Sequence, residues 1–246
     1  MMLPPKPKKL TPSANQAGFT IIESLMAIIV VSIFMIAIAP VIVLSVATRV
    51  QARRVEMATQ AAQGYIDALR AETIDAPPIN TATGNPPELK GIIDDLKEID
   101  PPPTGNLTCD ASQYCTQPTS PNYRLYCVDG NGGGCTNDNF KDMIVQAFGV
   151  NTTTIPTGTN LTPQQVNQQR AQQGYHLGIR VYRADAFTSG RTLQASTGER
   201  EATFTGGTGL KPSQKPLIEL TTEIVTGGTS YNDFCNRVGC NNQIEF

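Results

Sequence analysis

The chain has 246 residues, a formal net charge of -2, one histidine and no tryptophan. This length suits one membrane element followed by one globular domain of ordinary size. The near-neutral charge gives no reason to expect binding of nucleic acid by the whole domain. The abundance of Gly, Pro, Thr, Asn and Gln is more typical of a loop-rich, exported domain than of a compact cytosolic enzyme.

The amino-terminal segment combines a basic leader with a long apolar run. Residues 1–17, MMLPPKPKKLTPSANQA, are polar and contain Lys6, Lys8 and Lys9, and no charged residue occurs over residues 24–48. A helix over those 25 residues is roughly 37 Å long, enough to cross a bilayer core of about 30 Å. Glu23 stands at the start of this run, where a charged carboxylate costs at least ~2.5 kcal/mol if it reaches the bilayer centre.

Two general interpretations of this segment leave something unexplained. A cleaved signal peptide is favoured by the A-x-A pattern at residues 37–39. However, the apolar stretch is longer than the usual ~7–15 residues and Pro40 would become the first mature residue. A plain single-span anchor accounts for the length but not for Glu23.

A third interpretation comes from a family resemblance. The sequence GFTIIES resembles the processing site of type IV prepilins and pseudopilins, with its glycine at Gly18, its methylatable aromatic residue at Phe19 and its glutamate at Glu23. Pro40 corresponds to a position where pilin helices often carry proline, and we expect it to kink or locally melt the helix. The resemblance covers residues 1–70.

The resemblance also implies partners and a role for the glutamate. A prepilin peptidase would cut between Gly18 and Phe19 on the cytoplasmic face and methylate the new amine. Other pilins or pseudopilins and an inner-membrane assembly platform would be the remaining partners. Glu23 would pair with the amine of a neighbouring subunit, because buried charges persist when they are paired. The alternative is a glutamate that reaches the lipid headgroups.

The helix is expected to continue beyond the membrane in amphipathic form, from Phe19 to about Glu72, and to stop before Pro77 and Pro78. Its apolar positions recur at spacings of three and four: Val55, Ala58, Ala62, Tyr65 or Ile66, and Leu69.

The run VATRVQARRVEMATQAAQGYIDALRAETIDAPP is similar to hormogonium polysaccharide secretion pseudopilins of filamentous cyanobacteria. That similarity implies a role in polysaccharide export and gliding motility. A minor pseudopilin of a type II secretion system and a membrane-anchored glycan-binding module are the alternatives.

The remainder of the chain is predicted to be a small sheet with long loops. Strand-like runs occupy residues 122–129, 142–150, 175–187 and 215–226, with Leu177, Ile179 and Val181 on one face of the third run and Tyr182 on the other. Short helices are expected over residues 86–100 and after Thr162, with Pro163 at the first helical position. The expected fold class is α+β and pilin-like, a long helix packed on a small antiparallel sheet. The expected domains are a leader (1–18), a membrane and assembly helix (19–48), its amphipathic continuation (49–75) and a periplasmic globular domain (76–246).

The six cysteines indicate an oxidising compartment, because their even number lies in Gly- and Asn-rich, loop-like surroundings. Fifteen pairings are possible in principle. The short gaps favour three local loops: Cys109–Cys115, Cys127–Cys135 and Cys235–Cys240.

The orientation of the helix in the membrane does not follow from charge alone. Arg49, Arg53 and Arg54 after the span balance the three lysines before it, so the positive-inside count is equal on the two sides. The disulfides place the carboxy-terminal part outside the cytosol.

Little in the sequence supports catalysis or metal binding. His176 is the only histidine, and general base catalysis needs a partnered base. No C-x-x-C spacing is present, so the zinc templates fail. The loop DGNGGGCTNDN has the first ligands of a calcium site but Phe140 at the twelfth place, where a carboxylate is needed. We therefore expect no enzyme activity, no cofactor and no metal.

Overall fold

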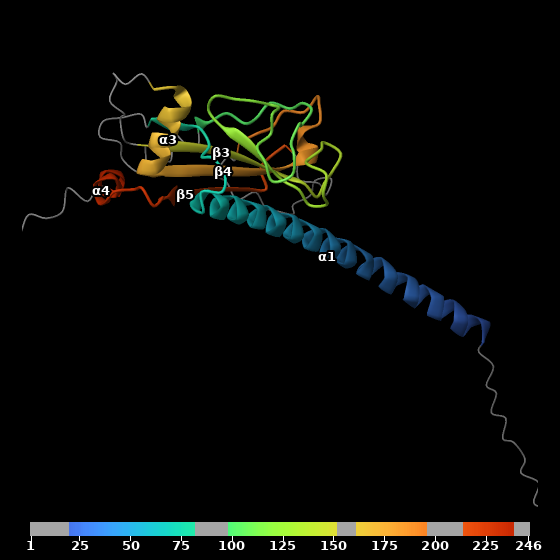
Figure 1. Ribbon diagram of the computed structural model, residues 1–246. Helices are drawn as coiled ribbons and strands as arrows, with labels where there is room; N and C mark the ends of the chain where they lie inside the picture. Colours follow the sequence, from blue (N-terminus) through green and yellow to red (C-terminus); the bar gives the residue numbers. More distant parts are fainter. Residues whose placement is uncertain (1–19, 82–97, 152–160, 196–213, 239–246) are drawn as a thin grey trace, which may run out of the picture. The chain divides into compact units, whose positions relative to one another are not determined.

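The computed structural model describes residues 20–81, 98–151, 161–195 and 214–238 (Figure 1). The chain divides into two compact units, Met1–Ala47 and Thr48–Phe246. Helix α1 (Ile21–Arg70) contributes to both units. The second unit contains the sheet and the remaining helices.

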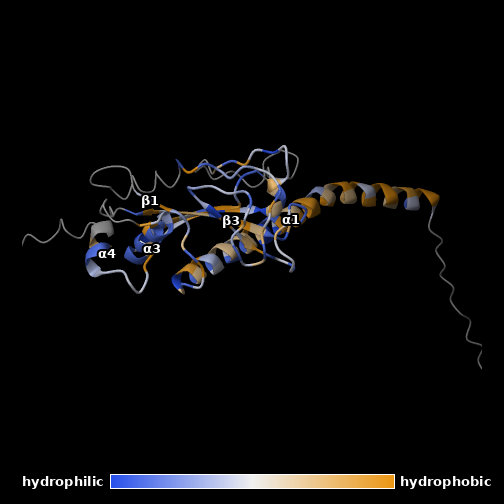
Figure 2. Cartoon of the chain, turned by 45° about the horizontal axis from the view of Figure 1, so that its top comes forward, coloured by the Kyte–Doolittle hydropathy of each residue, from blue (hydrophilic) through white to orange (hydrophobic). Residues whose placement is uncertain are grey.

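Helix α1 confirms the predicted long helix, within two residues at each end. Its first part is mostly apolar and its second part is mixed (Figure 2). The chain leaves the helix at Glu72, whose φ of 54° is left-handed and incompatible with a further helical turn. The helix runs through Pro40 without a break, so the local melting expected there does not occur. The expected kink stays a prediction.

The sheet is mixed rather than purely antiparallel. Its strands are β1 (Ile79–Thr81), β2 (Arg124–Val128), β3 (Met143–Asn151), β4 (Tyr175–Arg183) and β5 (Ile218–Ile224). Strands β3, β4 and β5 are antiparallel neighbours in that order. The edge of β3 that does not face β4 pairs with two strands. Strand β2 pairs with it antiparallel along Met143–Ala147, and β1 pairs with it parallel along Gly149–Asn151. Strand β1 is the one the sequence did not predict, and it makes the sheet mixed.

The other predicted elements are confirmed with changed ends. Strand β4 stops at Arg183, and residues predicted to extend it form a 3-10 helix, η1 (Ala184–Phe187). Helix α3 (Pro163–Gln173) has the predicted Thr162 cap and Pro163 start, completed by Gln165 in a capping box. Helix α4 (Tyr231–Val238) was not predicted. The helix expected over residues 86–100 falls mostly outside the described residues.

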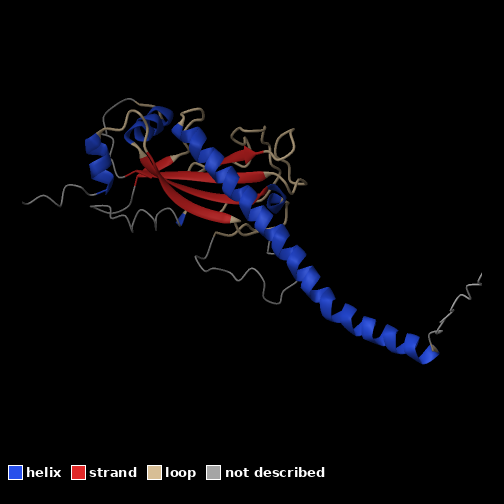
Figure 3. Ribbon diagram, turned by 90° about the horizontal axis from the view of Figure 1, so that it is seen from below, coloured by secondary structure: helices blue, strands red, loops and turns tan. Residues whose placement is uncertain are grey.

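One face of the sheet is covered by the second part of α1, which crosses the strands in Figure 3. The predicted apolar stripe is confirmed from Ala58 to Leu69, whereas Val55 is only partly buried. The buried residues of this part of the helix are Ala58, Ala61, Ala62, Tyr65, Ile66 and Leu69. It packs on Leu177, Ile179 and Val181 of β4, which confirms the predicted face of that strand. The helix therefore supplies one of the layers that an α+β fold requires.

The opposite face of the sheet is covered by loops instead of a helix. Its core contains Phe148, Tyr182 and Phe187 together with the loop residues Cys109 and Cys135 and with Cys127 of β2. Backbone hydrogen bonds and the disulfides Cys109–Cys115 and Cys127–Cys135 join these loops to one another and to β2.

Candidate assembly segment and disulfide-linked loops

The first part of α1 presents a mostly apolar surface, in which Glu23 and three serines are the polar residues. Every residue from Ile21 to Val46 is exposed, including Ile21 at 88 %, Phe34 at 62 % and Ile36 at 76 %. The helix is long and apolar enough to cross a membrane by length and composition. Contiguous apolar surfaces of this kind mark contact with membrane or with other proteins. The helix fits a single-pass inner-membrane anchor.

The start of this helix is held by a local cap. The Thr20 hydroxyl accepts a hydrogen bond from the Glu23 backbone N–H at 3.3 Å, and the Thr20 carbonyl accepts from the N–H groups of Glu23 and Ser24 at 3.0 and 3.2 Å. The sequence T-I-I-E is the capping-box pattern. Sequence reasoning missed the cap at Thr20, although the pattern was readable. A carboxylate in the first turn also interacts favourably with the helix dipole.

Of the predicted processing and assembly residues, the structure describes only Glu23. Gly18 and Phe19 lie outside the described residues, whereas Glu23 is exposed in the first turn of α1. Two serine hydroxyls of the apolar part donate to carbonyls of the helix itself, Ser24 to Ile21 at 2.8 Å and Ser32 to Ile28 at 2.7 Å. Back-bonding of this kind spares a hydroxyl the cost of an apolar environment.

The far end of α1 is fixed to the globular unit by a tyrosine cluster. The Tyr114 hydroxyl donates to the Asp75 carbonyl at 2.5 Å, so the Tyr65 hydroxyl, 2.8 Å away, is the donor to Tyr114. The rings of Tyr65 and Tyr126 lie 5.1 Å apart between centroids, and the Arg124 guanidinium lies 4.8 Å from the Tyr114 centroid. Burial raises the pKa of Tyr65 and that of Tyr114 well above the ordinary value. Sequence analysis did not single out Tyr114, which comes from a loop.

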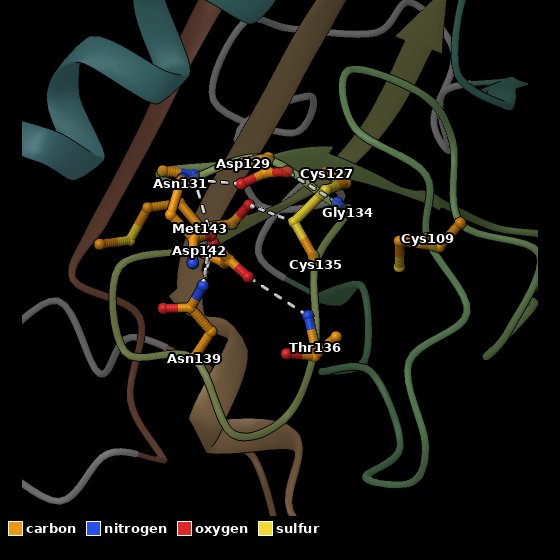
Figure 4. Close-up of a disulfide and its surroundings, with 12 residues drawn as sticks. Cys109, Cys127, Asp129, Asn131, Gly134, Cys135, Thr136, Asn139, Asp142 and Met143 are labelled. Atoms are coloured by element: carbon orange, nitrogen blue, oxygen red, sulfur yellow. Dashed lines mark hydrogen bonds between the residues drawn. A yellow bond between two sulfur atoms is a disulfide. The ribbon is translucent and has the colours of Figure 1, made fainter.

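Two disulfides organise the loops on the other face of the sheet. Cys109–Cys115 and Cys127–Cys135 are both bridged, as two of the three predicted local loops require. Figure 4 shows the second bridge beside Cys109, and the Cys135 N–H donates to the Cys109 carbonyl at 3.1 Å. The two loops are thus joined to each other. Cys235 is also disulfide-bonded, and Cys240 lies outside the described residues.

The loop that resembled a calcium site is satisfied by its own groups. Asp129 accepts from the N–H groups of Asn131, Gly132 and Gly134 at 2.7–2.8 Å, and these hydrogen bonds lower the pKa of its carboxyl. Buried Asp142 accepts from the N–H groups of Gly130 and Thr136 and from the side chain of Asn139 (Figure 4). Both carboxylates therefore act as turn-forming acceptors. Within the described ranges, no group of three or more His, Cys, Asp or Glu side chains is arranged to hold a metal ion.

The remaining candidate, His176, lies in β4 opposite Val150 of β3 and Glu223 of β5. It is half-buried within the sheet. This is the structural placement that the alternating strand pattern favoured.

Comparison with known families adds one finding. A family model described as the prokaryotic N-terminal methylation motif matches residues 13–39, which is 27 of the 246 residues. The match supports the type IV pilin and pseudopilin family, processing by a prepilin peptidase and a structural subunit that assembles with other pilins. No curated protein and no solved structure matches the chain.

Proposed function

We propose that the chain is a pseudopilin or minor pilin that assembles through its amino-terminal helix into a filament supporting polysaccharide secretion and gliding motility. The observation that carries this proposal is the coincidence of the methylation motif with an exposed apolar helix. The same helix continues into a globular unit and supplies one face of its core. The globular part lies in the periplasm, where its disulfides persist.

The polysaccharide role rests on the similarity of residues 46–78 to hormogonium secretion pseudopilins. A minor pseudopilin of a type II system is the runner-up. A tethered glycan-binding module is the rival from another class. Amino-terminal sequencing of the mature protein separates assembly subunit from tether, because a methylated Phe19 start belongs to the first and an intact leader to the second.

Cleavage after Gly18 makes the first prediction. Gly18→Val puts a branched side chain where the peptidase is expected to accept glycine, so the protein should stay unprocessed and larger by the 18-residue leader on a denaturing gel. Ala17→Val is the matched control beside the cut and should still mature. If Gly18→Val runs at the size of the mature wild-type protein, the assignment of cleavage after Gly18 is wrong.

The charge of Glu23 makes the second prediction. Glu23→Gln keeps a side chain suited to the capping box and removes the charge, whereas Glu23→Ala removes both. If the carboxylate pairs with a neighbour's amine in an apolar fibre, both variants should be cleaved and inserted normally yet incorporate poorly into filaments, because an unpaired buried charge costs about 3–5 kcal/mol. Membrane fractionation, a processing gel and a filament preparation measure the three steps. Normal incorporation of the Gln variant would leave capping as the role of Glu23.

A further inference from the structure

A groove lined by both polar and apolar groups lies in the globular unit, between α3 and the segment that follows α1. Its volume is about 1070 Å³, slightly above the usual range of roughly 300–1,000 Å³ for small-molecule sites. Among the residues that line it, Gln164, Gln168 and Gln172 come from α3, Glu72 and Asp75 from the segment after α1, and Arg124 from β2. None of these belongs to the methylation motif or to the apolar part of α1.

The groove has a fixed wall because α3 is held by hydrogen bonds rather than by apolar packing. The helix has no buried residue. Asn167 Oδ1 accepts from the Ile79 N–H at 2.8 Å, and the Arg170 guanidinium donates to the Ile79 carbonyl at 2.6 Å and to the Thr81 hydroxyl at 3.0 Å. At the other end, the Thr229 hydroxyl donates to the Gln172 carbonyl at 3.0 Å.

The same hydrogen bonds argue against a peptide in this groove. A peptide strand binds by pairing with free N–H and C=O groups at a sheet edge. At Ile79 of β1 both of these groups are already used by α3 side chains. Recognition in the groove therefore depends on side chains.

The side chains on the α3 wall suit hydroxyl groups. Gln164, Gln168 and Gln172 are spaced by four residues, which places them on one helix face. All three are exposed, and their amides make no hydrogen bond to any described residue. Each amide offers donors and an acceptor in one plane. A hydroxyl is also both donor and acceptor, so a row of amides matches a row of hydroxyls.

The charges and the apolar lining of the groove further restrict the class of ligand that it fits. Glu72 and Asp75 carry two negative charges and Arg124 and Arg170 two positive ones, so the groove is neutral overall. Arg124 is positioned over the Tyr114 ring. Three proline rings, Pro78, Pro121 and Pro163, supply apolar surface between the polar groups. A neutral chain of hydroxyl-bearing rings with apolar faces fits this lining better than a polyanion.

We propose that this groove binds a segment of a neutral polysaccharide, several sugar units long, through the amide row of α3. This inference deepens the proposed role in polysaccharide export and rests on it for the choice of polymer. The groove gives the subunit a direct contact with the exported chain, while the helix and Glu23 serve assembly.

The test uses the full chain in detergent micelles and titration calorimetry. The probe is a neutral, size-fractionated oligosaccharide mixture prepared from the polysaccharide that the source cells secrete, and heparin is the polyanion comparison. We expect saturable binding of the neutral probe and weaker binding of heparin. The double variant Gln164→Ala and Gln168→Ala should bind the neutral probe at least about tenfold more weakly, a factor of ten being 1.4 kcal/mol. Its thermal midpoint should be unchanged.

Gln169→Ala is the matched control, because Gln169 is exposed on the same helix but does not line the groove. It should bind as wild type. Absence of binding by wild type, equal loss in the control, or preference for heparin would each overturn the proposal. The double variant should retain leader cleavage and filament incorporation. Loss of filament incorporation in Glu23→Gln, with leader cleavage retained, tests the proposed function separately from the groove.

Discussion

Gly178 shows how a single residue fixes the packing of the loop-covered face. It lies opposite Phe148 in the β3–β4 register, and a Cβ at this position would stand 2.2 Å from Phe148 Cε2. The ring therefore lies over the glycine. The same ring contacts the buried Arg180 guanidinium, 5.2 Å from its centroid, so moving it disturbs a buried charge as well.

Replacing this glycine is expected to destabilise the domain. Gly178→Ala forces the Phe148 ring to shift and should lower the free energy of unfolding by about 1–3 kcal/mol, as overpacking does. Urea unfolding of the full chain in detergent measures the effect. Gly64→Ala is the control, since a Cβ there has no neighbour within 4 Å in an exposed helical position and should stabilise by about 0.4–1 kcal/mol. Equal effects of the two substitutions would contradict the packing argument.

At the scale of elements, the loops and disulfides substitute for a second helical layer. Cys127 ends a buried part of β2 and Cys135 belongs to the loop that returns to β3. The bridge links that loop to the sheet, and the backbone N–H of Cys135 donates to the Cys109 carbonyl. The Cys109–Cys115 bridge in turn brings Tyr114, its next-door neighbour in sequence, against Tyr65 of α1. The two bridges thereby connect the loop layer to the helix.

Removing the buried bridge should loosen this layer. The double variant Cys127→Ala and Cys135→Ala releases a loop with a sequence separation of 8 and should cost about 2–3 kcal/mol of stability by the chain-entropy relation. The unfolding midpoint of the variant, compared with that of wild type under non-reducing conditions, gives the value. Reduction of wild type with dithiothreitol should shift the midpoint at least as far. An unchanged midpoint in the double variant would show that the bridge does not stabilise the loop layer.

How far the sequence predicts the fold depends on the element. The long helix, four strands, the α3 cap and two disulfides follow from periodicity, proline positions and short cysteine gaps, which are all local signals. Strand β1 was missed because INT is too short to show alternation and pairs with β3 across about 70 residues. Tyr114 and the groove were missed for the same reason, since loops bring their members together. The cap at Thr20 was local, and its pattern was available in the sequence.

At the scale of the whole molecule, tyrosine hydroxyls are concentrated in the core of the globular unit. Tyr65, Tyr175 and Tyr182 are buried and Tyr114 is partly buried. Burial raises the pKa of each well above the ordinary value. Two of these residues join α1 to the loops, and the other two lie in β4. Ionisation of this group would therefore act on the helix, the loops and the sheet together.

We expect the free energy of unfolding of the globular unit to fall at alkaline pH, because the pKa values of these tyrosines are raised in the folded state. Because the folded state holds the four tyrosines neutral, with pKa values above that of an unfolded tyrosine near 10, unfolding above about pH 10 releases protons. The stabilisation is complete below the unfolded pKa and declines as the pH rises toward the folded values, by up to about 1.4 kcal/mol per pH unit for each tyrosine. Urea unfolding of the full chain between pH 8 and pH 11 should show this decline. Tyr65→Phe should reduce the slope, whereas the substitution Tyr231→Phe at an 81 % exposed position should not. Equal slopes in wild type and Tyr65→Phe would mean that burial of the tyrosine cluster does not control the alkaline transition.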